Sequence, residues 1–327
     1  MVKTLLHKHP DVRNDFRKLA ELIRKESKIL LVSGNNPDGD SIGTMAALNR
    51  FCQKNGAEAI SFCKTEIPQN LHYLVLPQII NNIKDLPESV GVAITFDLGQ
   101  LSQTGIKDYL LKRAHTIVNI DHHQTNDRFG HINIINSESA STTELIYNFF
   151  IDIGFQIDEE TATALLTGLI TDTGNMSNPG TTPSALAMAS HLIRCGGNLK
   201  EILAHTYNNK SLPVLKLWGD IIEKLHHNTS FGITAAVISR EQFANFDGTD
   251  EWIEGLANFL TVLGEAKAIL VLREIEKGVF KGSLRTTRDD VNVEIFARAL
   301  GGGGHKKAAG FAFEGTLEKK ENSWYIS

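Results

Sequence analysis

Apolar residues in the first part of the chain follow a helical spacing in several segments. In residues 11–27 they fall at Phe16, Leu19, Leu22 and Ile23, the spacing of an amphipathic helix. Further helices are predicted at 41–56, 141–154, 158–174 and 182–197. Their ends carry helix signals, because "STTE" at 141–144 is a capping box, Pro183 suits a first helical position and Gly56 suits a helix end.

Apolar, β-branched runs lie between these helices and predict strands. The runs are residues 28–34, 57–63, 90–99 and 115–123. Strands that alternate with helices indicate an α/β fold, so we expect an N-terminal, mainly parallel sheet with helices on both faces. In such a sheet, ligands bind beyond the carboxyl ends of the strands.

The pattern changes near residue 229. Residues 231–239 and 266–287 predict strands, and residues 291–311 predict a helix that runs into a glycine-rich loop. We therefore expect a catalytic domain at 1–205, a helical linker at 206–228 and a smaller α/β domain at 229–327.

Composition narrows the class of protein. The 327 residues are 42% hydrophobic and 22% charged, as in ordinary soluble domains. No apolar run reaches the roughly 18 residues of a membrane span, and the polar residues within positions 1–16 argue against a secretory leader. The three cysteines, with no CxxC pair, fit a reducing cytoplasm. A net charge of −5 argues against a protein that coats long nucleic acid.

Acidic residues gather where the predicted strands end. Asp38 and Asp40 follow the first strand, Asp97 ends the third and "DHH" at 121–123 ends the fourth, while Asp172 closes a predicted helix. Singly, each has a plain structural explanation as a turn, cap or core residue. Together, carboxylates this close would repel one another unless cations neutralise them. Oxygen-rich ligands with one or two imidazoles suit a pair of manganese or magnesium ions, which can stabilise the oxygens of a phosphoester undergoing hydrolysis.

Five motifs occur in an order that resembles the DHH phosphoesterases with a DHH-associated C-terminal domain, in particular the nano-RNase and 3′-phosphoadenosine 5′-phosphate phosphatase branch. They are "NPDGDSIG", "TFDLG", "NIDHHQTNDRFG", "GLITDTGNMSNPGTTPSAL" and "GGGGHKKAAGF". The resemblance covers nearly the whole chain.

The resemblance implies a role for each clustered residue. Two Mn²⁺ ions are expected, with Mg²⁺ as the other candidate. Asp38 would hold the first ion, Asp97 would bridge both, and the second would be held by Asp40, His122 and Asp172. His123 and Asp121 form the implied catalytic pair, in which His123 faces the substrate phosphate and leaving oxygen and Asp121 orients the histidines.

Three positions depart from the family pattern. Gly34 stands where a metal-binding histidine is usual, with Asn35 beside it, and arginines expected near Gln103 and Met176 are missing. The first metal site should therefore be weak. These departures support the alternative that the protein is a degenerate nucleotide-binding sensor or scaffold with little hydrolytic activity.

The C-terminal glycines predict a binding site for an anion. Backbone N–H groups of glycines can approach a phosphate closely. Lys307 and Arg288 add nearby positive charge, although a flexible loop with solvated charges would look similar. By the resemblance, the terminal phosphate and base of a short nucleotide would be bound by Arg285, Gly302, Gly303, Gly304, His305 and Lys306.

The favoured function is a metal-dependent phosphoesterase acting on very short RNA or DNA oligonucleotides, linear dinucleotides or nucleotide 3′-phosphates. Related pyrophosphatases lack the GGGGHK loop, and a processive exonuclease would be expected to carry a further nucleic-acid-binding domain. The sequence leaves the oligomeric state open, with a homodimer as one candidate.

Overall fold

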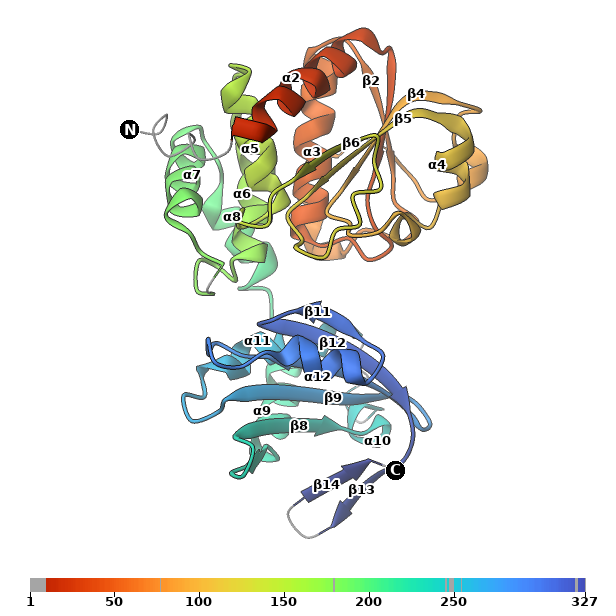
Figure 1. Ribbon diagram of the computed structural model, residues 1–327. Coiled ribbons are helices and arrows are strands. Elements are labelled where there is room, and N and C mark those ends of the chain that lie inside the picture. Colours follow the sequence, from red (N-terminus) through yellow and green to blue (C-terminus); the bar gives the residue numbers. More distant parts are fainter. Residues whose placement is uncertain are drawn as a thin grey trace. The chain divides into compact units, whose positions relative to one another are not determined.

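The computed structural model describes residues 10–76, 78–178, 180–244, 246, 250–253, 255–320 and 323–326. The inference about a secretory leader rests largely on residues 1–9, which lie outside the described residues. The chain divides into two compact units, residues 1–209 and 210–327. Each unit is described by itself below (Figure 1).

In the described part of the first unit, six parallel strands form one sheet in the order β3-β2-β1-β4-β5-β6. The strands are β1 (Lys28–Val32), β2 (Glu58–Phe62), β3 (Ile79–Ile80), β4 (Val90–Phe96), β5 (Ala114–Asp121) and β6 (Ile132–Ile135). The short strands β3 and β6 extend the sheet that the sequence predicts.

Helices cover both faces of this sheet, as predicted. They are α2 (Pro10–Lys25), α3 (Gly39–Lys54), α4 (Lys107–Arg113), α5 (Thr142–Asp152), α6 (Glu159–Asp172), α7 (Pro183–Arg194) and α8 (Leu199–Thr206), with 3-10 turns η2 (Gln69–Leu71), η3 (Ile83–Asp85) and η4 (Leu101–Thr104). The ribbon shows α2, α3 and α5 on one side of the strands and α4 on the other (Figure 1).

Strand β1 shows why both faces are covered. Ile29 and Leu31 pack in the core shared with α2, α3, α5 and α6, whereas Leu30 and Val32 pack in the core shared with α4. Successive side chains of a strand point to opposite faces, so a continuous apolar run needs a helical layer on each side.

The second unit contains a mixed sheet of order β11-β12-β10-β9-β8-β7 in its described part, in which β8 and β9 are parallel and the other neighbours antiparallel. Its strands are β7 (His226–Asn228), β8 (Ile233–Ile238), β9 (Ala268–Glu276), β10 (Val279–Arg285), β11 (Gly303–His305) and β12 (Ala308–Glu314), and a separate hairpin pairs β13 (Leu317–Lys320) with β14 (Ser323–Ile326).

Helices also pack on both faces of this second sheet. They are α9 (Leu212–Glu223), α10 (Arg240–Ala244), α11 (Leu256–Phe259) and α12 (Val293–Ala299), with the turns η5 (Asp250–Ile253) and η6 (Leu260–Val262). Helices α9 and α11 share one core and α12 another. The segment 206–228, expected as a linker, thus contributes α9 and β7 to this unit.

Across the described ranges, every helix is too short or too polar to span a bilayer.

Candidate metal centre and active site

The acidic residues lie at the point where the strand order of the first sheet reverses. Strand β1 is followed by β2 on one side of it, and the chain then returns to place β4 on its other side. Ligands of open α/β sheets bind at such a switch point, beyond the carboxyl ends of the strands. Asp38 follows β1, Asp97 follows β4 and Asp121 is the last residue of β5.

Asp38 is the N-cap of α3. Its Oδ1 accepts hydrogen bonds from the backbone N–H groups of Asp40 at 3.0 Å and Ser41 at 2.9 Å. Although the residue is exposed, the surrounding protein and the charge of Asp172 raise the pKa of Asp38. Asp38 therefore caps a helix and also belongs to the acidic cluster.

Asp40 is fully buried and is held by the start of another helix. Its Oδ2 accepts from the N–H of Thr142 at 2.6 Å and its Oδ1 from the N–H of Thr143 at 2.9 Å, both in the first turn of α5. Burial, followed by the charge of Asp172, raises the pKa of Asp40 to about 7. The two amide bonds fix the plane of the carboxylate.

Asp97 sits in a left-handed backbone conformation with φ 57°, which is uncommon for a residue other than glycine. Its N–H donates to the carbonyl of Ile120 at 2.9 Å, and its Oδ2 accepts from Oγ of Ser41 at 2.6 Å. Burial, with the charges of Asp38 and Asp40, raises the pKa of Asp97 well above its usual value. Strained residues held firmly by their surroundings are common at functional sites.

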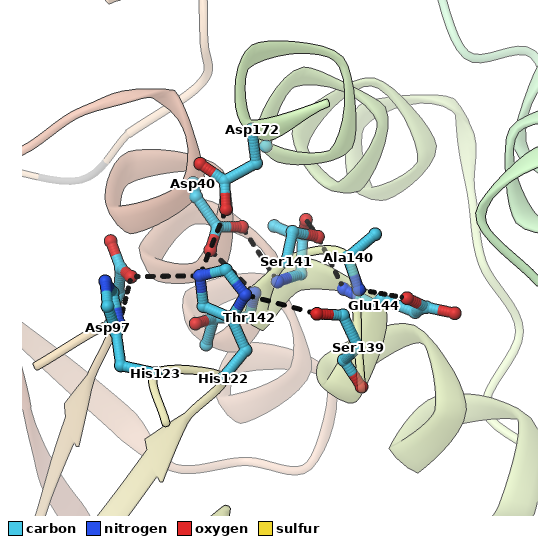
Figure 2. Close-up of polar contacts among 12 residues, drawn as sticks. Asp40, Asp97, His122, His123, Ser139, Ala140, Ser141, Thr142, Glu144 and Asp172 are labelled. Atoms are coloured by element: carbon cyan, nitrogen blue, oxygen red, sulfur yellow. Dashed lines mark hydrogen bonds and ion pairs between the residues drawn. The ribbon is translucent and has the colours of Figure 1, made fainter. Parts of the chain in front are cut away.

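His122 joins this cluster to Asp172 at the end of α6 (Figure 2). Its Nε2 lies 3.1 Å from Oδ2 of Asp172 and 3.9 Å from Oδ1 of Asp97, and its Nδ1 donates to the carbonyl of Ser139 at 3.2 Å. Burial alone would lower the pKa of His122, but the bond to Asp172 and the charges of Asp40 and Asp97 raise it well above the usual value. The bond to Ser139 directs Nε2 toward the carboxylates.

His123 is oriented by Asp121. Its Nδ1 donates to Oδ1 of Asp121 at 2.6 Å, and the same oxygen accepts from the backbone N–H groups of His122 and His123. Oδ2 of Asp121 accepts from the side-chain amide of Asn126 at 2.6 Å. Burial opposes ionisation of Asp121, yet the hydrogen bonds from His123 and Asn126 prevail and lower its pKa. Asp121 therefore stays a carboxylate that holds the ring of His123.

Two overlapping sets of side chains could each hold a metal ion. One is Asp97, His122 and His123, and the other is Asp40, His122 and Asp172; within each set the candidate ligand atoms lie within 4.8 Å of one another. Burial and mutual repulsion raise the pKa values of these three carboxylates, Asp38, Asp40 and Asp97, and bound cations would favour their ionised forms. Oxygen donors with imidazole nitrogen fit Mn²⁺ or Mg²⁺.

The departures at Gly34, Gln103 and Met176 have structural counterparts. A β-carbon added at Gly34 would lie 2.7 Å from Cδ2 of Leu98. The side-chain oxygen of the adjacent Asn35 lies close to Gly105, because a β-carbon added at Gly105 would be 2.6 Å from this oxygen. Gln103 caps η4 by accepting from the N–H of Gln100, and Met176 packs against the core. Asn35 is thus turned toward η4.

The predicted nucleotide-binding residues lie in the second unit. Arg285, at the end of β10, donates from Nε to the side chain of Asn258 at 2.7 Å, and burial lowers its pKa. His305 ends β11, and the carbonyl of Lys306 accepts from the N–H of Val293. Lys307 and Arg288 are paired with Asp289 and Asp290, so part of the expected positive charge is neutralised.

The glycine run is more ordered than the predicted loop. Gly303 and Gly304 belong to β11, and Gly302 donates its N–H to the carbonyl of Ala297 at the end of α12. A β-carbon at Gly302 would lie 2.1 Å from the carbonyl oxygen of Gly310, and one at Gly304 would lie 2.5 Å from that of Ala308. Close approach of β12 is thus one reason for these glycines.

Sequence reasoning did not identify several residues that hold the cluster in place. They are Ser41, Asn126, Ser139, Thr142, Thr143 and Glu144. The capping box at 141–144 was the available signal, and Oγ of Ser141 does accept from the N–H of Glu144 at 3.1 Å. The box predicts a helix start, and nothing in it indicates that Asp40, about a hundred residues earlier, binds there.

Comparison with known proteins gives matches along most of the chain. Residues 28–169 match the DHH family, N-terminal domain, and residues 232–323 match the DHHA1 domain. A bifunctional oligoribonuclease and PAP phosphatase NrnA of Thermus thermophilus is 29% identical over 304 residues, which cover 91% of this chain and 88% of that protein. The protein of the same name from Bacillus subtilis is 25% identical over 296 residues, covering 89% and 91%.

A solved structure shows the same fold. The exopolyphosphatase-related protein from Bacteroides fragilis superposes with a TM-score of 0.84 at 23% identity, over 93% of this chain and 92% of that one.

Proposed function

Since this protein belongs to the DHH family and carries a DHHA1 domain, we propose that it is a metal-dependent phosphoesterase. Its substrates are very short RNA or DNA oligonucleotides, linear dinucleotides or nucleotide 3′-phosphates. The names of the Thermus and Bacillus relatives, which align over about nine-tenths of each chain, support this substrate class.

One observation carries the proposal. Two sets of candidate metal ligands share His122 inside a cluster of carboxylates whose pKa values are raised. In this assignment Asp40, His122 and Asp172 would hold one ion, Asp38 would help to hold the other, and Asp97 would contribute to both. Divalent ions at these positions, manganese before magnesium, would neutralise the carboxylates and stabilise negative charge on the phosphoryl oxygens.

The remaining residues of the site would transfer a proton and bind the substrate. Asp121 binds Nδ1 of His123 at 2.6 Å, which leaves Nε2 as the ring nitrogen that can exchange a proton with the leaving oxygen of a substrate. In the second unit, the half-buried guanidinium of Arg285, with His305, Lys306 and Gly302–Gly304, would bind the phosphate and base of a short nucleotide.

The alternative is a nucleotide-binding sensor with little turnover. Gly34 favours it, because the first metal then lacks the side-chain ligand that the family pattern supplies. The ligands of the second metal are all present, and they favour the enzyme.

The test is hydrolysis of the RNA dinucleotide 5′-pApA and of 3′-phosphoadenosine 5′-phosphate, each with Mn²⁺, Mg²⁺ or EDTA. Release of mononucleotide or phosphate that needs metal and disappears in Asp97→Asn is the expected result. Nucleotide binding without turnover at saturating metal would favour the sensor, and hydrolysis of pyrophosphate alone would overturn the substrate class.

A further inference from the structure

We propose that Glu144 is a positioning residue for the metal site formed by Asp40, His122 and Asp172. The inference rests on the proposed function to the extent that this site holds a metal. Glu144 lies in the first turn of α5, only 3% exposed, and belongs to neither set of candidate ligands among the described residues. Its effect on the metal would pass through the turn that precedes α5.

The turn from Ser139 to Thr143 holds two of the three ligand side chains (Figure 2). The carbonyl of Ser139 accepts from Nδ1 of His122, so that Nε2 is left facing Asp172. The N–H groups of Thr142 and Thr143 bind the two carboxylate oxygens of Asp40. A single short segment therefore sets the ring of one ligand and the carboxylate plane of another.

The first N–H groups of a helix have no partner within the helix, and they carry partial positive charge. At α5 the carboxylate of Asp40 supplies the missing acceptor for two of them. The geometry of Asp40 is consequently only as well defined as the position of the first turn of α5.

Glu144 ties this turn to the helix. Its Oε2 accepts from the N–H of Ala140 at 2.7 Å, while its own N–H donates to Oγ of Ser141 at 3.1 Å. Ala140 lies directly between Ser139, which binds His122, and Ser141, which begins the helix. The usual capping box reaches back to the N-cap residue, and here it reaches one residue further. Glu144 thereby fixes the segment that binds His122 relative to the segment that binds Asp40.

Removing this acceptor would leave the buried N–H of Ala140 without its partner, and Ser139 could then move relative to α5. Groups that orient metal ligands typically contribute tenfold to one hundredfold to metal affinity. We expect Glu144→Met, which keeps length and apolar contacts, to weaken Mn²⁺ binding by about that factor. Glu144→Gln keeps an oxygen acceptor and should retain affinity within a few-fold.

The experiment measures Mn²⁺ affinity by electron paramagnetic resonance of the free ion, without substrate, and thermal unfolding in EDTA. Phe150→Leu is the matched control, because Phe150 is a fully buried residue of α5 that packs against Phe51, Phe149 and Phe155 away from the turn. It should lower the unfolding temperature while leaving Mn²⁺ affinity unchanged. Glu144→Asp, which keeps the charge but shortens the reach, replaces Glu144→Met if that variant does not fold, and it should lose affinity in the same way.

The inference is overturned if Glu144→Met and Glu144→Asp bind Mn²⁺ like the wild type. It is also overturned if Glu144→Gln loses as much affinity as Glu144→Met, or if Phe150→Leu loses as much as either. If the wild-type protein binds no Mn²⁺, the metal site itself is wrong, and both this inference and the proposed function fail.

Discussion

Ser41 donates a hydrogen bond of 2.6 Å from Oγ to Oδ2 of Asp97, and so joins the first turn of α3 to the end of β4. Asp97 is the residue expected to touch both metal ions, so this bond orients the shared ligand. We expect Ser41→Ala to weaken Mn²⁺ binding about tenfold, in line with other groups that orient metal ligands. Calorimetric titration with Mn²⁺ measures this, with the exposed Ser102→Ala as control. Unchanged affinity in Ser41→Ala would show that Asp97 is held by the backbone alone.

Gly168 allows α6 to approach Asp40. A β-carbon there would lie 2.4 Å from Cγ2 of Thr143 and 2.6 Å from Oδ1 of Asp40. We expect Gly168→Ala to lower the free energy of unfolding by about 1–3 kcal/mol, because the helices must separate, and to weaken metal binding as Asp40 is displaced. Gly219→Ala in α9 is the matched control, since its β-carbon meets nothing within 4 Å; this change should stabilise by about 0.4–1 kcal/mol. Urea unfolding and Mn²⁺ titration separate the two effects. Equal behaviour of both variants would contradict the packing argument.

The metal-free protein should become less stable as the pH rises from about 4 to about 7. Burial, followed by the charge of Asp172, raises the pKa of Asp40 from its ordinary value of 3.8 to about 7, so over this interval the folded protein holds a proton that the unfolded chain has released. Stability falls with pH wherever the folded state binds more protons. The raised pKa values of Asp38, Asp97 and His122 act in the same direction, and the lowered pKa of Asp121 acts oppositely in acid.

Unfolding temperatures in EDTA at pH 5, 6, 7 and 8 test this prediction. They should fall across the series, and saturating Mn²⁺ should restore most of the loss at pH 8, where ligand carboxylates are ionised most readily. Asp40→Asn, which cannot titrate at this position, should show a shallower fall. An unfolding temperature in EDTA that rises from pH 5 to pH 8 would contradict the raised pKa of Asp40 in the folded protein.

The strand ends could be predicted from the sequence because apolar runs stop abruptly at charged residues. Asp97 and Asp121 follow such runs directly, and the parallel order of the strands then brings them together. The motif around Asp172 predicts it as a site residue, and it lies at the end of α6 as expected. Strands β3 and β6, of two and four residues, are too short to produce a clear pattern.

The turn from Ser139 to Thr143 could not be predicted as part of the site, because it acts through backbone groups. Thr142 and Thr143 bind Asp40 through their backbone N–H groups, which any residue except proline would supply. The carbonyl of Ser139 is equally independent of its side chain. The glycines at 301–304 are ambiguous in another way. Glycine allows close approach of a bound phosphate and equally of a neighbouring strand, and the sequence alone cannot distinguish these two reasons.

The role of Gly34 is tested with and without a change at Leu98. Its backbone lies outside the left-handed region, so φ does not exclude a side chain, but a β-carbon would lie 2.7 Å from Cδ2 of Leu98. We expect Gly34→His alone to destabilise the protein by about 1–3 kcal/mol through overpacking. Gly34→His with Leu98→Ala should bind Mn²⁺ more tightly than Leu98→Ala alone, because an imidazole ligand is added to the first site. Equal affinity in these two variants, both folded, would show that the first site does not use this position.

Arg285 and Arg288, both in the second unit, allow a controlled comparison of two arginines. Arg285 is partly buried against Asn258, whereas Arg288 is exposed and bonded to Asp290. If Arg285 binds the phosphate of a short nucleotide, Arg285→Ala should weaken binding of 5′-pApA by about tenfold or more, while Arg288→Ala should change it little. Both should leave Mn²⁺ affinity intact. Fluorescence anisotropy of a labelled dinucleotide measures the binding, and equal losses in the two variants would contradict a specific role for Arg285.

The proposed metal ligands are dispersed along the first unit from Asp38 to Asp172, and the last of them comes from the end of α6. During synthesis on the ribosome, the site therefore stays incomplete until α6 has emerged, long after the first ligands are available. Binding of an ion at Asp40, His122 and Asp172 would follow folding of most of the first unit, because Asp40 is held by the first turn of α5 and Asp172 lies at the end of α6. Emergence of Asp172 thus sets the earliest moment at which the proposed site of Asp40, His122 and Asp172 can be complete.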